Sequence, residues 1–146
     1  MKLKETPYDS FFEEQEEKYQ IPGLANIIKS MAFTESSFDP EAVGELGEKG
    51  MMQFRDATAE QYGVQDPFNP QQAITGAAQK FADDYNYYTD QGFNSLKARN
   101  LAIEAYNGGR GNAGKSKQTS IYLDKVLGNL PDVSISSNVR DFRSED

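Results

Sequence analysis

Cysteine and histidine are both absent from the 146 residues of this chain. Without cysteine there is no disulfide framework, no thiolate nucleophile and no cysteine-based metal site. Without histidine, the most common general base and the most common metal ligand are missing as well. Acid–base chemistry near neutral pH therefore has to come from a carboxyl group, a lysine or a tyrosine whose pKa the fold shifts. We expect no cofactor and no bound metal.

Long apolar runs and an excess of positive charge are also missing. The net charge is −8, with 23 acidic and 15 basic side chains, and a field of that sign disfavours nucleic acids and anionic membranes as partners. No apolar run approaches the roughly 20 residues that a helix needs to cross a bilayer. Residues 1–7 lack the apolar core of a signal peptide. We therefore expect a soluble chain that does not insert into a membrane and is not exported by the usual route.

The chain is long enough for one domain with a hydrophobic core. Apolar residues make up 37% of it, and its nine phenylalanines and eight tyrosines set it apart from disordered chains. After Pro131 the sequence becomes polar. We predict one domain over residues 1–130 and a polar C-terminal tail over residues 131–146.

Helix start and stop signals predict a mostly α fold with little strand. Thr6, Pro7 and Asp9 suit the N-cap, N1 and N3 positions of a first helix, and the acidic residues between Glu13 and Glu17 suit its solvated face. The first predicted elements are a helix to about Tyr19, a helix after Pro22-Gly23, a loop or tight ribbon at 39–50 and a short helix after Asp56. A longer helix is predicted to begin at a capping box formed by Asn69 and Gln72 and to end at about Gly92. The last elements are a helix that Ser95 caps and Asn107-Gly108-Gly109 ends, a loop at 110–119, and a helix from about Ser120 to Leu127.

Glu35 lies at the end of an apolar helix face. Leu24, Ile28, Met31 and Glu35 follow one another at steps of four, three and four, so they share one side of the second predicted helix. Burial beside such a face and the negative end of the helix dipole both favour the protonated carboxyl. Cleavage of a glycosidic bond requires an acid that stays protonated near neutral pH. On this pattern alone, an ordinary glutamate turned toward water is the alternative.

Three short motifs then occur in order: Glu35-Ser36, Gly50-Met51-Met52-Gln53 and Ala105-Tyr106-Asn107. They resemble the signature of the soluble lytic transglycosylases, which share a fold with goose-type lysozyme. The resemblance extends from about Tyr8 to Leu127. It implies a compact lysozyme-like helical domain with a short loop or β-ribbon after the catalytic helix.

The resemblance also implies roles for individual residues. Glu35 would be the catalytic acid and then the base. Substrate contacts are implied for Ser36 of the Glu-Ser pair, Gln53 in the sugar cleft, Tyr106 and Asn107 facing the glutamate and the sugar, and Tyr122 at the position of the family's late cleft tyrosine. Taken singly, these positions also have ordinary structural explanations, such as a core aromatic or a helix stop.

The chain departs from the family pattern near the second motif. Met51 replaces the leucine of Gly-Leu-Met-Gln, which is a mild change between flexible apolar side chains. Gly44 stands where the family often has a serine that contacts the reacting sugar, and Arg55-Asp56 stands where it often has Met-Pro. The second difference predicts a charge pair at the edge of the cleft. These changes concern substrate contacts and leave the acid in place.

The implied reaction is cleavage of the β-1,4 bond between N-acetylmuramic acid and N-acetylglucosamine in peptidoglycan, with a 1,6-anhydro product. A hydrolytic lysozyme of the same fold is the close alternative, and a glycan-binding module without activity is a more distant one. Hydrolysis needs a second carboxylate near the acid. The candidates are Glu45, Glu48, Asp56 and Glu104, of which Glu104 is expected to point elsewhere because it precedes Tyr106 by two positions on a helix.

The expected partners are the glycan strands of peptidoglycan. An acidic wall-degrading protein without a signal peptide suggests a bacteriophage protein, carried in the virion for entry or released at lysis, with contacts to other virion proteins. A catalytic piece of a larger wall-remodelling protein is the alternative.

Overall fold

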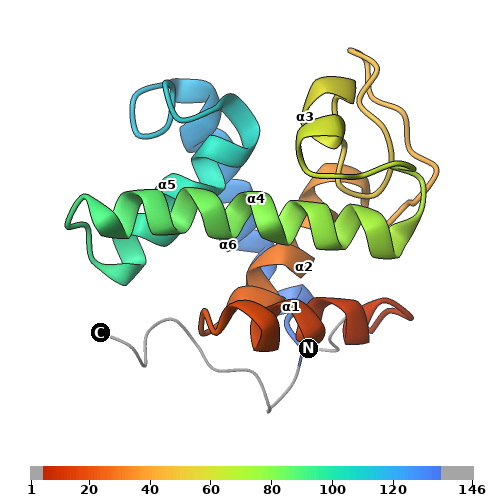
Figure 1. Ribbon diagram of the computed structural model, residues 1–146, viewed down its shortest axis with the longest axis horizontal. Coiled ribbons are helices and arrows are strands. Elements are labelled where there is room, and N and C mark those ends of the chain that lie inside the picture. Colours follow the sequence, from red (N-terminus) through yellow and green to blue (C-terminus); the bar gives the residue numbers. More distant parts are fainter. Residues whose placement is uncertain (1–4, 136–146) are drawn as a thin grey trace.

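Residues 5–135 are described by the computed structural model, and six α-helices follow one another within them (Figure 1). The predicted mostly α fold is confirmed. Extended pairing in the described part is limited to single bridges of Lys49 with Val43 and with Phe54, which form a tight ribbon where one was predicted. The helices are α1 (Asp9–Tyr19), α2 (Leu24–Ser36), α3 (Asp56–Gln61), α4 (Pro70–Asp90), α5 (Ser95–Gly108) and α6 (Lys117–Val133).

α2 is the central helix of the fold and contacts α1, α4 and α6. Its predicted apolar face is confirmed, because Leu24, Ile28 and Met31 are all completely buried. Burial extends beyond that face to Lys29 and Ser30. A helix covered on most sides has to satisfy such polar groups internally, and Ser30 does so by donating a hydrogen bond to the carbonyl of Val126 in α6.

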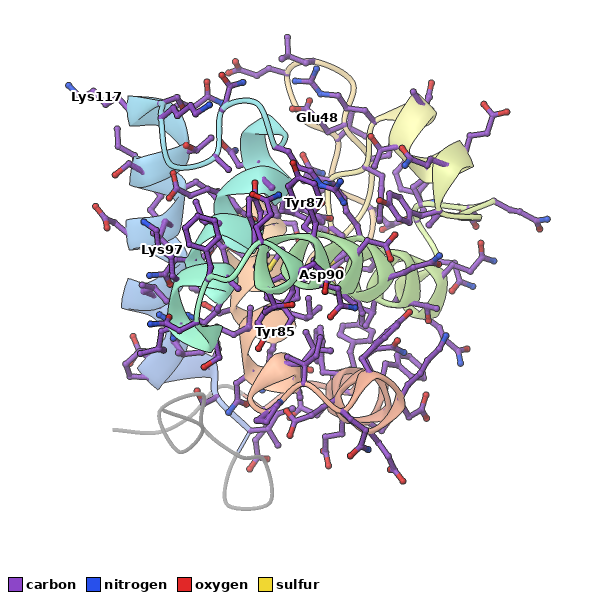
Figure 2. The ribbon with its side chains drawn as sticks, turned by 60° about the vertical axis from the view of Figure 1, so that its left-hand side comes forward. Glu48, Tyr85, Tyr87, Asp90, Lys97 and Lys117 are labelled. Carbon is purple, nitrogen blue, oxygen red and sulfur yellow. The ribbon has the colours of Figure 1, made fainter. Side chains whose placement is uncertain are left out.

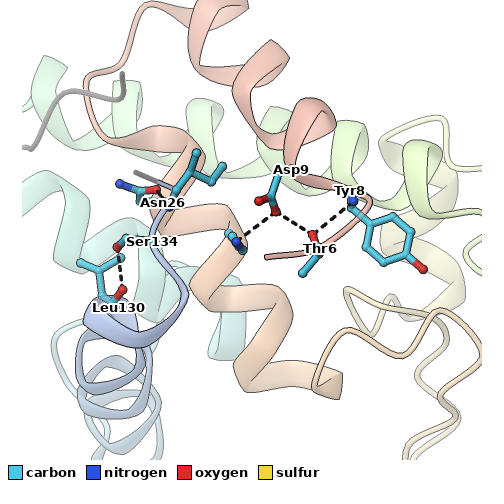
Figure 3. Close-up of polar contacts among 8 residues, drawn as sticks. Thr6, Tyr8, Asp9, Asn26, Leu130 and Ser134 are labelled. Carbon is cyan, nitrogen blue, oxygen red and sulfur yellow. Dashed lines mark hydrogen bonds and ion pairs between the residues drawn. The ribbon is translucent and has the colours of Figure 1, made fainter. Parts of the chain in front are cut away.

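The chain entering α1 is tied to α2 through an ion pair (Figure 3). The Oδ1 atom of Asp9 lies 3.0 Å from the buried Nζ of Lys29 and accepts a hydrogen bond of 2.6 Å from the hydroxyl of Thr6. The same hydroxyl accepts from the amide of Tyr8. The predicted cap is therefore wrong: Tyr8 is the N-cap residue and the helix begins at Asp9, because Thr6 and Asp9 are engaged in this cluster.

One glutamate of the predicted solvated face of α1 has a structural contact. Glu13, Glu14 and Glu17 are exposed, whereas Glu16 is half-buried. The Oε1 atom of Glu16 accepts a hydrogen bond of 3.0 Å from the amide of Ala25. That amide belongs to the first turn of α2, where no carbonyl of the helix itself can pair with it. Glu16 thus stabilises the start of the central helix.

The starts of α4 and α5 show where capping signals succeed and where they are off by one position. Asn69 caps α4 as predicted, through a bond from the amide of Gln72. The side chain of Gln72, however, accepts from the amide of Asp66, so the capping box is incomplete. Asn94, and not Ser95, caps α5 by accepting from the amide of Lys97. Both residues can act as caps, and the path of the chain after α4 decides between them.

α6 is longer than predicted at both ends. Ser116 caps it by accepting from the amide of Thr119, so residues 117–119 are helical and not part of the preceding loop. The helix also continues through Pro131 to Val133, which is completely buried. Burial of this last turn offsets the hydrogen bond that the proline cannot make.

The end of α6 is attached to α2, as the close-up in Figure 3 shows: the amide of Ile135 donates a hydrogen bond of 2.7 Å to Asn26. The predicted tail lies mostly outside the described residues, and the domain boundary after residue 130 stays a prediction. None of the helices in the described part is both long and apolar enough to cross a bilayer.

Candidate active site

The carboxyl group of Glu35 lies in the last turn of α2, where the apolar face of that helix ends. The side chain is half-buried. Its Oε2 atom accepts a hydrogen bond of 2.8 Å from the phenol of Tyr122 in α6. Two residues that are far apart in the sequence are therefore in direct contact at this site.

The surroundings of Glu35 raise its pKa from 4.5 to about 7. Burial is the main cause, because a carboxylate loses its hydration there. The hydrogen bond from Tyr122 acts in the opposite direction, since it stabilises the ionised form, and the negative charge of Glu48 raises the pKa again. A carboxyl group with this pKa exists in both protonation states near neutral pH, as a group that first gives and then takes a proton must.

Two tyrosines beside Glu35 stay protonated and act as hydrogen-bond donors. Burial and the negative charge of Glu35 raise the pKa of Tyr106 and of Tyr122 well above 10. Tyr122 donates to Glu35, whereas Tyr106 donates a bond of 2.8 Å to the carbonyl of Met52. The ring of Tyr106 also packs edge-on against Phe54.

The three sequence motifs meet at the turn formed by residues 50–53. The hydroxyl of Ser36 donates to the carbonyl of Met51 over 2.8 Å, and Tyr106 donates to the next carbonyl. Gly50 has a φ of +82°, and a Cβ atom on it would lie 1.8 Å from the carbonyl oxygen of Pro67. The second motif is thus locked to the first and third by hydrogen bonds, and it requires glycine at its first position.

Gln53 ends this turn in a left-handed backbone conformation, with a φ of +54°. Its side-chain amide donates to the carbonyls of Gly50 and Ala42, which closes the ribbon on itself. Gly44 lies beside it: a Cβ atom there would lie 2.6 Å from Oε1 of Gln53 and 2.6 Å from Oε1 of Glu48. A serine at this position would require both side-chain ends to move.

A pocket of about 470 Å³ opens beside Glu35, and Tyr122 and Asn107 also line it. The Oδ1 atom of Asn107 lies 3.4 Å from Nε2 of Gln118, which donates to it. Of the six positions predicted from the resemblance, these three share the pocket. Ser36 and Tyr106 are sequence neighbours of pocket residues, whereas Gln53 is not among the residues that line the pocket. Each of these three side chains donates a hydrogen bond to a backbone carbonyl of residues 50–52.

Sequence reasoning missed the contribution of the first turn of α6. Lys117 and Gln118 line the pocket, but the loop predicted at 110–119 included them. Ser116 was the available signal, because serine is a favoured cap residue and a helix starting there places residues 117, 121 and 125 on one face.

The four candidate second carboxylates lie in different surroundings. Glu104 is buried and accepts hydrogen bonds from the hydroxyl of Thr119 and the amide of Gly114, so it points away from the acid as expected. Asp56 is exposed and pairs with Lys49 over 3.2 Å, so the expected pair with Arg55 is replaced by one across the ribbon.

The other two candidates, Glu45 and Glu48, lie on the ribbon. Glu45 is exposed and Glu48 is half-buried, and of the four candidates only Glu48 affects the pKa of Glu35. Figure 2 labels Glu48 on this ribbon, away from the helical body. Within residues 5–135, no three acidic side chains are grouped so that they could share a metal ion.

The fold and the site together describe a lysozyme-like helical domain. Residues 10–125 match the family described as Transglycosylase SLT domain, and the chain belongs to that family. The resemblance inferred from the three motifs is therefore confirmed.

Named relatives agree with this assignment. The chain is 34% identical, over 86% of its length, to "Membrane-bound lytic murein transglycosylase F 2" of Alkalilimnicola ehrlichii. It is 32% identical over 71% of its length to "Transglycosylase" of Enterobacteria phage PRD1, and 32% identical over 73% to "Peptidoglycan transglycosylase gp16" of Escherichia phage T7. The matched part spans only 26%, 36% and 8% of these three relatives, respectively.

Proposed function

We propose that this protein is a peptidoglycan lytic transglycosylase in which Glu35 acts first as the acid and then as the base. The observation that carries the proposal is the half-buried carboxyl of Glu35, with a pKa of about 7, facing a pocket and bound by Tyr122. Membership of the Transglycosylase SLT domain family and the names of the relatives support the same reaction class.

In the first step, protonated Glu35 donates its proton to the oxygen that bridges N-acetylmuramic acid and N-acetylglucosamine. The bond between this oxygen and C1 of the muramic acid breaks, and the glucosamine leaves with a hydroxyl group. Tyr122 then stabilises the carboxylate that has formed, through the hydrogen bond that it already makes. General acid catalysis of this kind contributes about 10²- to 10⁴-fold to the rate.

In the second step, the C6 hydroxyl of the same muramic acid attacks C1, and the Glu35 carboxylate takes its proton. The product is a 1,6-anhydro ring, and the enzyme returns to its protonated form. Because the attacking group is part of the substrate, proximity replaces a bimolecular encounter with water. Because Asn107 lines the pocket, we assign to it the orientation of the sugar, while Ser36, Gln53 and Tyr106 bind the 50–53 turn.

Hydrolysis is the second candidate, and the observation that favours it is the negative charge of Glu48, which raises the pKa of Glu35. A hydrolytic mechanism requires a substrate bound between the two carboxyl groups. In that arrangement Glu48 would activate a water molecule as general base, as in inverting glycosidases.

Mass spectrometry of products from digested sacculi separates these functions. Anhydromuropeptides support the transglycosylase, and reducing muramic acid ends would show hydrolysis instead. The same digestion with Glu35→Gln is expected to release almost nothing. If wild type and Glu35→Gln clear cell walls equally well, the assignment of Glu35 as the acid fails. If neither protein binds to cell walls and neither clears them more than buffer alone does, the proposal that the protein is an enzyme fails.

We also propose that the protein acts on the bacterial wall as part of a bacteriophage, either in the virion or at lysis. Two relatives are phage proteins, which supports this setting, whereas the bacterial relatives favour a piece of a larger wall-remodelling enzyme. Mass spectrometry of purified virions tests the virion role, and absence of the protein from them removes it.

A further inference from the structure

α6 presents two lysines and an isoleucine to the side of the pocket that holds Glu35. Lys117, Ile121 and Lys125 line the pocket and follow one another at intervals of four residues, so they lie on one face of the helix. Both lysines are exposed, and 45% of the surface of Ile121 is accessible. Figure 2 labels Lys117 at the first turn of α6, where its side chain projects into solvent. We call these three residues the lysine strip.

The charge of the strip is opposite to that of the protein as a whole. The net charge is −8, yet the charged side chains that line this pocket are two lysines and Glu35. Among the residues that the structure describes, neither Lys117 nor Lys125 forms an ion pair. By contrast, Lys29, Lys49, Lys80 and Arg110 all pair with aspartates. The two ammonium groups beside the candidate acid are therefore available to an anionic ligand.

The length of the strip indicates what kind of anion fits. Lys125 lies eight positions after Lys117, which corresponds to about 12 Å along the axis of α6. An extended peptide covers about 3.3–3.6 Å per residue, so three to four residues span this distance. The isoleucine halfway along suits a small apolar side chain. The matching ligand is a short extended peptide with separated carboxylates and a methyl group between them.

We propose that the lysine strip binds the acidic peptide stem of the muramic acid whose glycosidic bond is cleaved at Glu35. This inference rests on the proposed function, because only a peptidoglycan substrate carries such a peptide next to that bond. Stems contain alanine and free carboxylates. Lysine binds each carboxylate as a flexible point charge, which suits a peptide of variable composition. The strip favours peptide-bearing strands over bare glycan.

The test compares two substrates: glycan strands with their peptide stems, and the same strands after an amidase has removed the stems. The amidase hydrolyses the amide bond between the lactyl group and the peptide, so the bare strands gain a free lactyl carboxylate and lose every carboxylate of the peptide. The test variant is Lys117→Ala/Lys125→Ala. The matched control is Lys97→Ala/Lys115→Ala, which removes the same charge from exposed positions that do not line the pocket. Figure 2 labels Lys97 on α5.

For the strip variant we expect KM on peptide-bearing strands to rise by about 2- to 30-fold, the range for two exposed charge pairs, with kcat unchanged. KM on bare strands should stay constant, and the control should behave like wild type on both substrates. Lys117→Arg/Lys125→Arg should restore most of the affinity. An equal rise on both substrates, or no rise on either, overturns the proposal.

A binding measurement separates this proposal from the proposed reaction. Calorimetry of Glu35→Gln with a peptide-bearing disaccharide, at low and at high salt, reports on the strip without turnover. We expect weaker binding at high salt and in the variant that also lacks both lysines. If this binding pattern is found while wild type cleaves neither substrate, the proposed reaction is wrong and peptide binding by the lysine strip is supported. If the lysines do not change binding, the strip is wrong whatever the activity.

Discussion

The phenol of Tyr122 donates a 2.8 Å hydrogen bond to Oε2 of Glu35, across 87 positions of the sequence. This contact joins the last turn of α2 to α6. It works against burial, which is the main cause of the raised pKa of Glu35. The protonation of the candidate acid therefore depends on the position of a helix far along the chain.

Tyr122→Phe should move the alkaline limb of the pH–activity profile to higher pH. The substitution removes the hydrogen bond that stabilises the Glu35 carboxylate. The pKa of Glu35 therefore rises, and Glu35 stays protonated to higher pH. The profile of kcat/KM against pH measures this. Tyr19→Phe, at a partly exposed tyrosine of α1, is the control. A limb that moves to lower pH contradicts the assignment.

Glu48→Gln should move the same limb in the opposite direction. The negative charge of Glu48 raises the pKa of Glu35, and its removal lets Glu35 ionise at lower pH. Under the transglycosylase mechanism activity below the limb is retained, and the products remain anhydromuropeptides. Glu45→Gln, at an exposed position of the same ribbon, serves as control. Loss of all activity at every pH would instead support hydrolysis with Glu48 as base.

Glu35→Gln should stabilise the folded protein at alkaline pH and leave it nearly unchanged in acid. Below the unfolded pKa of 4.5 the carboxyl is protonated in both states. As the pH rises through about 7, the pKa of Glu35 in the folded protein, the buried carboxyl of the wild type ionises. The wild type thereby loses the stability that the protonated carboxyl contributed in acid. The gain in free energy of unfolding of Glu35→Gln over wild type at alkaline pH has an upper limit of about 3 kcal/mol. Urea unfolding at about pH 5 and pH 8 measures it, and an equal effect at both values contradicts the raised pKa.

Gly50→Ala should destabilise the protein far more than Gly47→Ala. Both glycines have positive φ angles, but a Cβ atom at position 50 meets a backbone carbonyl at 1.8 Å, whereas the same atom at position 47 meets nothing within 4 Å. The φ angle alone costs roughly 1–2 kcal/mol, which we expect for Gly47→Ala. For Gly50→Ala we expect more than about 3 kcal/mol, because a buried turn has to move. Equal losses of stability for the two variants in thermal unfolding would mean that the 50–53 turn can shift at little cost in free energy.

Glu104→Ala should cost about 1–3 kcal/mol of stability, because it removes the acceptor for the Gly114 amide and one acceptor for Thr119. Activity per folded molecule should fall only indirectly, through the start of α6. Thermal unfolding and kcat are measured together. Glu60→Ala, at an exposed glutamate of α3, should stay within about 0.5 kcal/mol of wild type. A variant of normal stability without activity would place Glu104 in the chemistry after all.

Much of the fold followed from local patterns. The apolar steps from Leu24 to Met31 identified the buried face of α2, and Asn69 marked the start of α4. Such features depend on neighbours within one or two turns, so the sequence carries them directly. The errors lie at helix ends. Ser116 and Ser120, or Asn94 and Ser95, are competing caps, and the packing of the neighbouring segments decides between them.

At the candidate site, the sequence by itself predicted Glu35 as the acid, and its three motifs identified the family to which the chain belongs. Only the tertiary structure decided what surrounds that acid. Tyr122 reaches Glu35 and the lysine strip lines the pocket because α6 packs against α2. A contact between helices separated by most of the chain depends on how all the intervening elements pack, and no local pattern encodes it.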